Sequence, residues 1–185
     1  MSPGVIVAVG LGGLVAVIVA IVIWRRRRRW QGTLPRQLAA ISYAQLSGIV
    51  LPKADEGFIH LDLVLLVAGG VLVVDTKDVA GAVFGSDRMQ SWTVIDGQRR
   101  FTFPNPQAAL YDRVAAVRQV LRSVPVDGKL IFTSGARFEK GIPAGVVTID
   151  QLLAQYETVD PRSPPPAVRA FMAEWEALAR AAVRP

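Results

Sequence analysis

The chain has 185 residues, of which 51% are hydrophobic, and a formal net charge of +6. This length is enough for one domain and an additional segment. The sequence contains no cysteine, which excludes disulfides, thiolate zinc sites and a cysteine nucleophile. Five of the positive charges form one run, Arg25 to Arg29, so the rest of the chain carries a net charge of only +1 (+6 minus 5). The basic character is therefore local and does not indicate a basic nucleic-acid-binding domain.

The first predicted element is a membrane span. Val5 to Trp24 contains no charged residue over 20 positions. At about 1.5 Å per residue it is long enough for a hydrocarbon core of about 30 Å. Positive charges follow the segment instead of preceding it, so it is an anchor rather than a cleavable signal peptide. The positive-inside rule then predicts a single-pass protein of the cell membrane, with a short N-terminus outside and the remaining chain in the cytoplasm.

The arginine run itself has two interpretations. As the cytoplasmic flank of an anchor, Arg25 to Arg29 would contact anionic lipid headgroups. The alternative is a nucleic-acid contact, to which we give less weight because topology already explains the charges. Trp24 and Trp30 bracket the run, as expected of side chains at a membrane interface. Residues 1–30 are therefore predicted to be the anchor and its basic flank.

A strand-rich region follows a short linker. Arg36 to Leu46 is predicted as a helix, since its apolar residues lie partly on one helical face. Apolar stretches bounded by Gly, Asp and Pro then predict strands. These strands are Gly48 to Leu51, Phe58 to Val67, Val71 to Lys77, Gly81 to Phe84, Ser91 to Ile95 and Arg99 to Phe103.

The next elements alternate between helix and strand. Asn105 and Pro106 are a favourable N-cap and first position for a helix that runs through Val120. Lys129 to Thr133 and Val146 to Thr148 are predicted strands, and a short helix is predicted from Asp150 to Tyr156. A strand-rich core with flanking helices indicates an α/β domain, which we assign to residues 31–158.

Residues 159–185 form a separate region. The segment from Asp160 to Pro166 is a stiff, proline-rich break. Apolar residues then recur at helical spacing from Val168 to Ala182, which predicts an amphipathic helix. Such a helix usually packs on its own domain, and the alternatives are a protein partner or a membrane surface.

The stretch VLVVDTKD closes an apolar strand with charged residues. Gly69 and Gly70 suit a two-residue hairpin turn, in which paired residue numbers sum to 139. Asp62 would then lie opposite Lys77, and Asp75 opposite Val64. Because side chains two apart share a face of a strand, Asp62, Asp75 and Lys77 would gather on one face. A three-residue loop would instead move Asp62 to the other face.

Two chemistries fit this cluster equally well on spacing alone. Carboxylates are hard ligands for Mg²⁺, which would activate a water and neutralise phosphate charge, while Lys77 would orient the water or stabilise developing charge. The alternative is a structural ion pair that closes the strand end.

The stretch FIHLDLVLLVAGGVLVVDTKDVAG, with Asn105 and Pro106 opening a helix, resembles the NERD (nuclease-related domain) family from about Leu34 to Tyr156. The resemblance implies a restriction-endonuclease-like mixed β-sheet flanked by helices, and a metal-dependent nuclease acting on DNA or RNA. It also implies that Asp62 and Asp75 are catalytic carboxylates and ligands of Mg²⁺ or Mn²⁺. Lys77 would be the catalytic lysine, and the Thr76 carbonyl an additional metal ligand.

Further features of the resemblance point in different directions. Gln107 and Tyr111 share a helix face and are similar to a substrate-proximal motif of RecB-like nucleases, although an ordinary helix start explains them equally well. The family commonly has Gly-Glu at its first helix, where this chain reads GTLPRQLAA without an acidic residue. The alternatives are therefore a catalytically inactive membrane-tethered scaffold that binds nucleic acid or protein, and an accessory subunit of a membrane complex.

Three side chains near these motifs are expected to have structural roles. His60, the only histidine, would share the face of Asp62 and is interpreted as a structural or incidental residue rather than a general base. Trp92 and Phe103 are expected to pack in the core or at its rim rather than to stack on bases. The acidic residues Asp78 and Asp87 are expected in loops and in contact with solvent.

Overall fold

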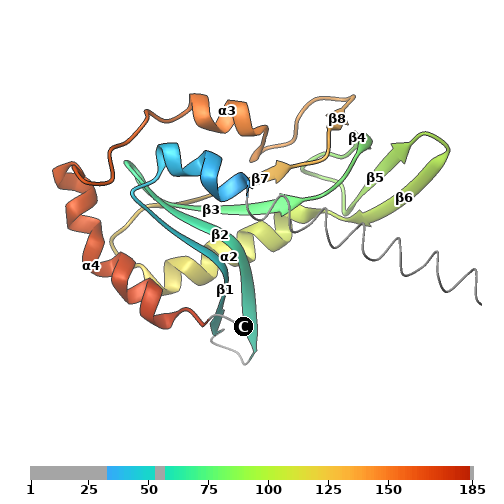
Figure 1. The fold of residues 1–185 in the computed structure, drawn as a ribbon. Helices are drawn as coiled ribbons and strands as arrows, with labels where there is room; N and C mark the ends of the chain where they lie inside the picture. Colours follow the sequence, from blue (N-terminus) through green and yellow to red (C-terminus); the bar gives the residue numbers. More distant parts are fainter. Residues whose placement is uncertain (1–32, 53–56, 184–185) are drawn as a thin grey trace, which may run out of the picture. The chain divides into compact units, whose positions relative to one another are not determined.

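The computed structural model describes residues 33–52 and 57–183. The chain divides into two compact units, Met1–Arg36 and Gln37–Pro185, and the fold below is that of the second unit (Figure 1). The predicted membrane span, Val5 to Trp24, lies outside the described residues. Over the ranges that the structure describes, no helix is both long enough and apolar enough to cross a bilayer.

The unit contains two mixed β-sheets. The larger sheet has the strand order β1-β2-β3-β7-β9, in which β1, β2 and β3 are antiparallel neighbours and β3, β7 and β9 are parallel. Its strands are β1 (Ala44–Pro52), β2 (Phe58–Val67), β3 (Gly70–Lys77), β7 (Val126–Phe132) and β9 (Val146–Val147).

The smaller sheet has the order β6-β5-β4-β8, in which only β4 and β8 are parallel. Its strands are β4 (Gly81–Phe84), β5 (Ser91–Asp96), β6 (Arg99–Pro104) and β8 (Ala136–Phe138). β4 follows β3 after three residues, so the end of β3 leads directly into the smaller sheet.

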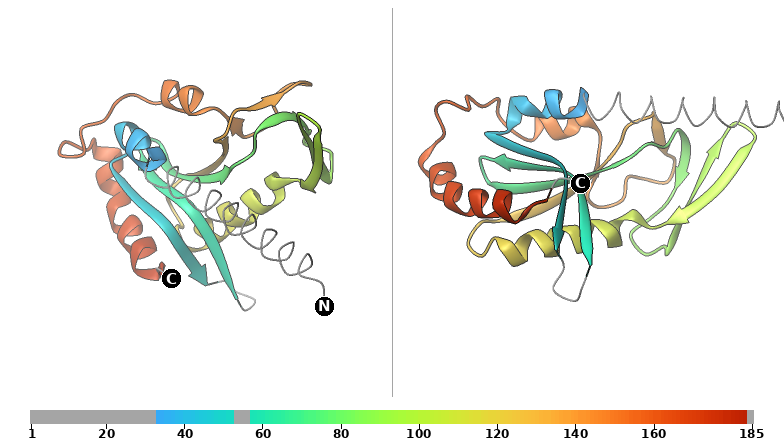
Figure 2. Two further views of the ribbon diagram at one scale, coloured as in Figure 1. Left: turned by 45° about the vertical axis from the view of Figure 1, so that its right-hand side comes forward. Right: turned by 60° about the horizontal axis from the view of Figure 1, so that its bottom comes forward.

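Helices cover both faces of the larger sheet. α2 (Pro106–Val120) and α4 (Pro166–Ala181) lie on one face, whereas the 3-10 turn η1 (Ala39–Ile41) and α3 (Ile149–Ala154) lie on the other (Figures 1 and 2). Successive side chains of a strand point to opposite faces. Because both faces are covered, β3 has to be apolar at consecutive positions, and Val71 to Val74 are all at most 2% exposed.

The position of α2 follows from residues at its start and along its length. The Asn105 side chain accepts a hydrogen bond from the Gln107 amide (2.9 Å), and Pro106 occupies the first turn. Further along, Leu110 and Val114 pack over Gly128 of β7, where an added Cβ would lie 2.7 Å from the Val114 side chain. α2 therefore lies close to the parallel part of the sheet.

The predicted α/β class and most predicted elements are confirmed, with one correction near the start. Residues 33–38 are helical and continue into η1, but β1 begins at Ala44, inside the helix predicted from Arg36 to Leu46. The Ser42 hydroxyl donates to the Leu38 carbonyl (2.9 Å), and the Tyr43 amide donates to Leu66 of β2 (2.8 Å). Pairing with β2 thus overrides the weak local helical pattern. The short strand β8 was not predicted.

The hairpin between β2 and β3 also differs from the prediction. Val67 pairs with Gly70 and Leu63 with Val74, so paired numbers sum to 137 and the turn residues are Ala68 and Gly69. Gly70 is inside the strand with a φ of +138°, and an added Cβ would overlap the Pro125 carbonyl. The glycine is therefore required for a close approach to the neighbouring chain segment, not for the turn.

The amphipathic C-terminal helix packs on its own domain. Val168, Trp175 and Leu178 of α4 are at most 6% exposed and belong to the same core cluster as residues of β2 and α2. Beyond α4, Val183 pairs with Val50 of β1 through two backbone hydrogen bonds of 2.9 Å. The apolar face of α4 is thus used inside the domain.

Candidate functional site

The site lies where β2 and β3 separate. Their ladder ends at the pair Leu63–Val74. Beyond this point β2 stays paired with β1, whereas β3 follows β7 as far as the pair Lys77–Phe132 (Figures 1 and 2). This divergence opens a fork between β2 and β3. The side chains of Asp62 and Asp75 lie at the fork, on the face of the sheet that α2 covers.

Asp62 occupies the fork. Its Oδ2 accepts hydrogen bonds from the Thr76 amide (2.9 Å) and the Thr76 hydroxyl (2.8 Å). The carboxylate therefore replaces the strand partner that Thr76 has lost. The register of 137, continued one step beyond its last pair Leu63–Val74, would set Asp62 opposite Asp75 rather than opposite Lys77, and the two-residue turn preserves the predicted shared face.

Asp75 is bound by two cations although its side chain is only 1% exposed. Lys77 Nζ lies 2.9 and 3.1 Å from its two carboxylate oxygens. Arg113 Nη1, from α2, lies 3.3 Å from Oδ2, and Arg113 Nε donates to the His60 carbonyl (2.8 Å). Arg113 thus ties α2 to both strands of the fork, and the paired cations compensate a buried carboxylate.

The two carboxyl groups have opposite pKa shifts. Burial raises the pKa of Asp75 above its ordinary value, and the charges of Lys77 and Arg113 offset this only in part. Burial acts in the same direction on Asp62, but hydrogen bonds from the Thr76 amide, from Asp75 and from the Thr76 hydroxyl bring its pKa below the ordinary value. Each carboxyl group also shifts the pKa of the other, Asp75 lowering that of Asp62 and Asp62 raising that of Asp75, so the two groups are close enough to influence each other.

His60 is nearer to the acidic cluster than its expected incidental role suggests. Its Nδ1 lies 3.4 Å from Asp62 Oδ1, and its side chain is 52% exposed. The histidine is therefore the more exposed member of this pair, since the Asp62 side chain is 28% exposed.

Gln107 and Tyr111 are not hydrogen-bonded to this cluster. Gln107 is 3% exposed, and its Nε2 donates to Asp87 Oδ1 (2.7 Å) and to the Ala144 carbonyl (2.8 Å). Asp87 also accepts from the Ala144 amide (2.8 Å), and these hydrogen bonds lower its pKa. Gln107 therefore connects α2 to two loops. Its Oε1 is buried without a hydrogen-bond partner among the described residues.

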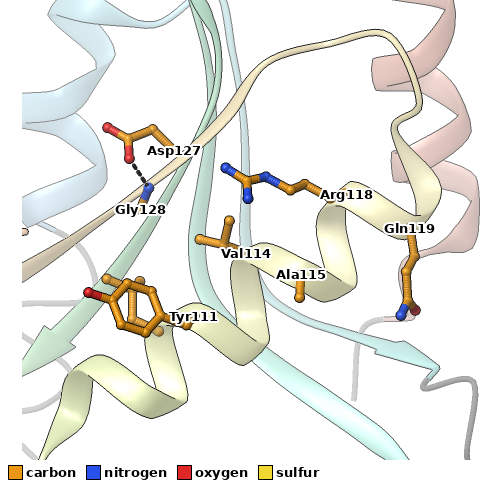
Figure 3. Close-up of a pocket in the computed structure, with 8 residues that line it drawn as sticks. Tyr111, Val114, Ala115, Arg118, Gln119, Asp127 and Gly128 are labelled. Atoms are coloured by element: carbon orange, nitrogen blue, oxygen red, sulfur yellow. Dashed lines mark hydrogen bonds between the residues drawn. The ribbon is translucent and has the colours of Figure 1, made fainter.

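Tyr111 is 60% exposed and lines a groove of about 610 Å³ between α2 and β7 (Figure 3). Arg118 and Asp127 lie on its two sides, and Val114 contributes to its apolar wall. The lining includes none of Asp62, Asp75 and Lys77. The groove and the acidic cluster are therefore separate features of the α2 side of the sheet.

The donor set of the cluster suits a hard cation. Asp62 and Asp75 supply two neighbouring carboxyl groups, and Mg²⁺ in proteins is commonly bound by one or two carboxylates with waters completing its octahedron. Within residues 33–52 and 57–183, no group of three or more acidic, histidine or cysteine side chains is arranged to hold a metal, either at the fork or away from it. A metal at the fork would therefore depend on two carboxylates and on non-carboxylate oxygens.

The comparison with known families gives a match over most of the site's elements. The profile of NERD, the nuclease-related domain, matches residues 29–133, which is more than half of the chain. The chain belongs to the nuclease-related domain family. The matched range contains the whole fork and α2 with Arg113, but it ends before β8. No curated protein and no solved structure gives a significant match.

Arg113 is the residue of the cluster that sequence patterns did not identify. It lies 36 positions after Lys77, in a helix whose sequence, AALYDRVAA, carries no recognisable motif at that position. The only available signal was an arginine within an otherwise weakly charged helix that follows the sheet. Its contact with Asp75 arises from the packing of α2 on the fork.

Proposed function

We propose that this NERD protein is a single-pass membrane protein whose cytoplasmic domain hydrolyses phosphodiester bonds of nucleic acid with a divalent metal. The observation that carries the proposal is the gathering of Asp62, Asp75 and Lys77 at the fork of the sheet within the NERD range. A mixed sheet with helices on both faces is compatible with a restriction-endonuclease-like fold.

Each residue has a role in this proposal. Asp62, Asp75 and the Thr76 carbonyl would hold Mg²⁺ or Mn²⁺, which when bound supplies an activated water and neutralises charge on the phosphate. Lys77, only 26% exposed, would place its ammonium beside the attacked phosphate and stabilise the charge that develops there. Gln107 and Tyr111 would lie toward the substrate side of α2.

The present ion pairs suggest how the site accommodates a metal. Asp75 is already compensated by Lys77 and Arg113, so a cation that binds Asp75 would release the Lys77 ammonium from it. Arg113, which also bonds the His60 carbonyl, would keep the carboxylate oriented during this exchange. Lys77 would then be free to contact a phosphate oxygen.

The same contacts support a second candidate, a membrane-tethered scaffold or accessory subunit without catalytic activity. Asp75 is 1% exposed, and two cations contact its carboxylate, as in a structural ion-pair network. A protein partner that binds α4 in this case would contact its exposed side, because Val168, Trp175 and Leu178 are buried in the domain.

Nuclease activity can be tested on the full-length chain purified in detergent. Labelled single- and double-stranded DNA and RNA would be incubated with Mg²⁺, Mn²⁺ or EDTA. We expect cleavage that requires the metal and falls at least about 100-fold in Asp75→Asn and Lys77→Ala. Asp150→Asn, at an exposed aspartate in the first turn of α3 on the other face of the sheet, is the matched control and should leave cleavage unchanged.

Cleavage that persists in both site variants would contradict the site assignment. A folded parent chain that neither cleaves nor binds Mn²⁺ would favour the scaffold.

The anchor is tested separately by cell fractionation. The full chain should remain in the membrane fraction after a high-salt wash, whereas a chain without Val5 to Trp24 should become extractable. Extraction of the full chain by salt alone would contradict a membrane span and indicate surface binding through the arginine run.

A further inference from the structure

The hairpin formed by β5 and β6 is an unusually exposed part of the domain. It projects beyond the larger sheet, and β6 is an edge strand that pairs only with β5 (Figures 1 and 2). Every residue of β6 except Phe103 is exposed. Neither the ion pairs of the fork nor the groove beside α2 involves this hairpin.

One face of the hairpin combines a cation with an aromatic ring. Directly opposed residues of antiparallel strands share a face, so Trp92, Val94 and Asp96 lie with Phe103, Phe101 and Arg99. Trp92 and Val94 are fully buried, but Phe101 is 46% exposed. The Arg99 side chain forms no ion pair with any residue that the structure describes, including its ladder partner Asp96.

This face is continuous with the catalytic cluster. Phe101 lies 6.4 Å from Phe103, Phe103 lies 6.2 Å from Trp92, and Trp92 stacks on Phe132 at 6.1 Å, all between ring centroids. Phe132 is the ladder partner of Lys77. A row of aromatic rings therefore leads from the lysine of the fork to the exposed Phe101.

The distance from the fork to the hairpin tip is short. Only three residues separate Lys77 from Gly81, so their Cα atoms are at most about 15 Å apart. Gly81 lies against Asp96 of β5, and Asp96 is paired with Arg99 of β6. Gly81 and Arg99 are therefore two strand spacings of about 5 Å apart. The Cα atoms of Lys77 and Arg99 are thus within about 25 Å of each other.

We propose that Arg99 and Phe101 on this face of the β5–β6 hairpin bind single-stranded nucleic acid whose next nucleotides lie at the Asp62–Asp75–Lys77 fork. This inference rests on the proposed nuclease function and assigns its substrate class. Arg99 contacts a phosphate, and the exposed ring of Phe101 stacks on an unpaired base. A base inside a duplex is already stacked between its neighbours, so its face is not available to the ring.

A second copy of the chain is a poorer occupant of the same strand. β6 carries the exposed Arg99 and Arg100, and charged side chains on an edge strand oppose its pairing with another chain. A polyanion, in contrast, complements these charges. The charge pattern therefore favours nucleic acid over self-association.

Binding can be measured without cleavage. The full-length chain in detergent would be titrated in EDTA against a fluorescein-labelled single-stranded oligonucleotide of about 12 nucleotides, over a range of salt concentrations. Arg99→Ala should weaken binding and reduce the slope of log affinity against log salt by about 0.7. Phe101→Ala should weaken binding about fivefold or more with an unchanged slope.

Two matched controls separate these effects from general ones. Arg122→Ala removes an exposed arginine that follows the far end of α2, about 22 Å along the helix from its start next to β6. Ile95→Ala removes an apolar side chain of similar exposure, 40%, from the opposite face of the same hairpin. Both variants should bind like the parent.

A second readout is independent of the arginine run at positions 25–29, which all variants share. Photo-crosslinking of an oligonucleotide that contains 5-bromouracil, followed by peptide mapping, should label the peptide that begins at Phe101. Unchanged affinity in Arg99→Ala and Phe101→Ala, or crosslinks confined to other peptides, would overturn the inference. Chemical crosslinks that join β6 of two copies of the parent chain would overturn it in favour of self-association.

The outcome is distinguishable from that of the nuclease test. An inactive chain that still loses binding on hairpin substitution would contradict the catalytic proposal and keep the hairpin assignment. An active chain whose binding and cleavage are unchanged by the hairpin substitutions would keep the catalytic proposal and contradict the hairpin assignment.

Discussion

At the scale of single residues, the two carboxyl groups of the fork differ in the direction of their pKa shifts. Asp62 accepts two hydrogen bonds from Thr76 and has a lowered pKa, whereas burial raises the pKa of Asp75. A lowered pKa in the folded chain means that Asp62 binds protons more weakly there than in the unfolded chain. Its stabilising contribution is therefore present above about pH 4 and is lost as the pH falls through the folded pKa.

The pH dependence of this stabilising contribution can be tested with Asp62→Ala. We expect the variant to lose about 2 kcal/mol in the free energy of unfolding at pH 7, because the Thr76 amide and hydroxyl lose a charged acceptor. The difference from the parent should shrink below about pH 4, where Asp62 begins to protonate. Urea titrations at both pH values measure it. A difference that grows on acidification would contradict the assigned charge state.

The network around Asp75 should behave as a unit. Asp75→Ala leaves Lys77 and Arg113 without their partner and should cost about 3 kcal/mol. Adding Lys77→Ala should cost less in this background than in the parent chain, since the lysine has already lost its contact. A double-mutant cycle of urea unfolding free energies measures the coupling, and strictly additive losses would show that the ion pair is energetically silent.

At the scale of elements, the register of the β2–β3 hairpin decides which side chains meet. The expectation that Gly69 and Gly70 form the turn was wrong by one position, because Gly70 is needed where β3 passes the Pro125 carbonyl. The face to which each side chain points is the same in the predicted and the observed register, since both have two-residue turns. Asp62 therefore faces the same side of the sheet as Asp75 in either case, with a different direct partner.

The two glycines provide a matched pair of substitutions. Gly70→Ala should destabilise the domain by about 3 kcal/mol or more, because its Cβ would overlap the Pro125 carbonyl at a φ of +138°. Gly69→Ala, with no atom within 4 Å of the added Cβ, should change stability by less than about 1 kcal/mol. Thermal unfolding compares them. Equal effects would contradict the register.

At the scale of the whole domain, α4 completes the core that positions the fork. Trp175 and Leu178 are buried in the same cluster as Val64 and Val73, which lie two positions from Asp62 on β2 and from Asp75 on β3. The chain end then pairs with β1 at Val50. The C-terminal region is therefore part of the domain and not a separate appendage.

Trp175→Ala tests this integration. Removal of a buried indole should cost about 3 to 5 kcal/mol and lower the Tm by about 10 °C. Glu176→Ala, at the exposed neighbouring position, should have little effect. Differential scanning fluorimetry is sufficient. A Tm that is unaffected by Trp175→Ala would mean that α4 is not required by the domain and is free for a partner.

The sequence by itself determined the features that depend on local chemistry. Alternation and turn residues located nearly all strands, the Asn105–Pro106 start located α2, and the two-residue turn brought Asp62 and Asp75 to one face. The sequence did not reveal that the segment around Ala44 is a strand rather than the predicted helix. The strand forms because Ala44 pairs with Leu66, which is 22 residues away.

Only the tertiary structure decided which charges meet. Arg113 contacts Asp75 because α2 packs on the fork, and Gln107 turns to Asp87 and Ala144 because loops from both sheets converge at the start of α2. Such contacts join residues dozens of positions apart, and no local spacing encodes them. Local periodicity places a side chain on a face, whereas packing between elements selects its partner.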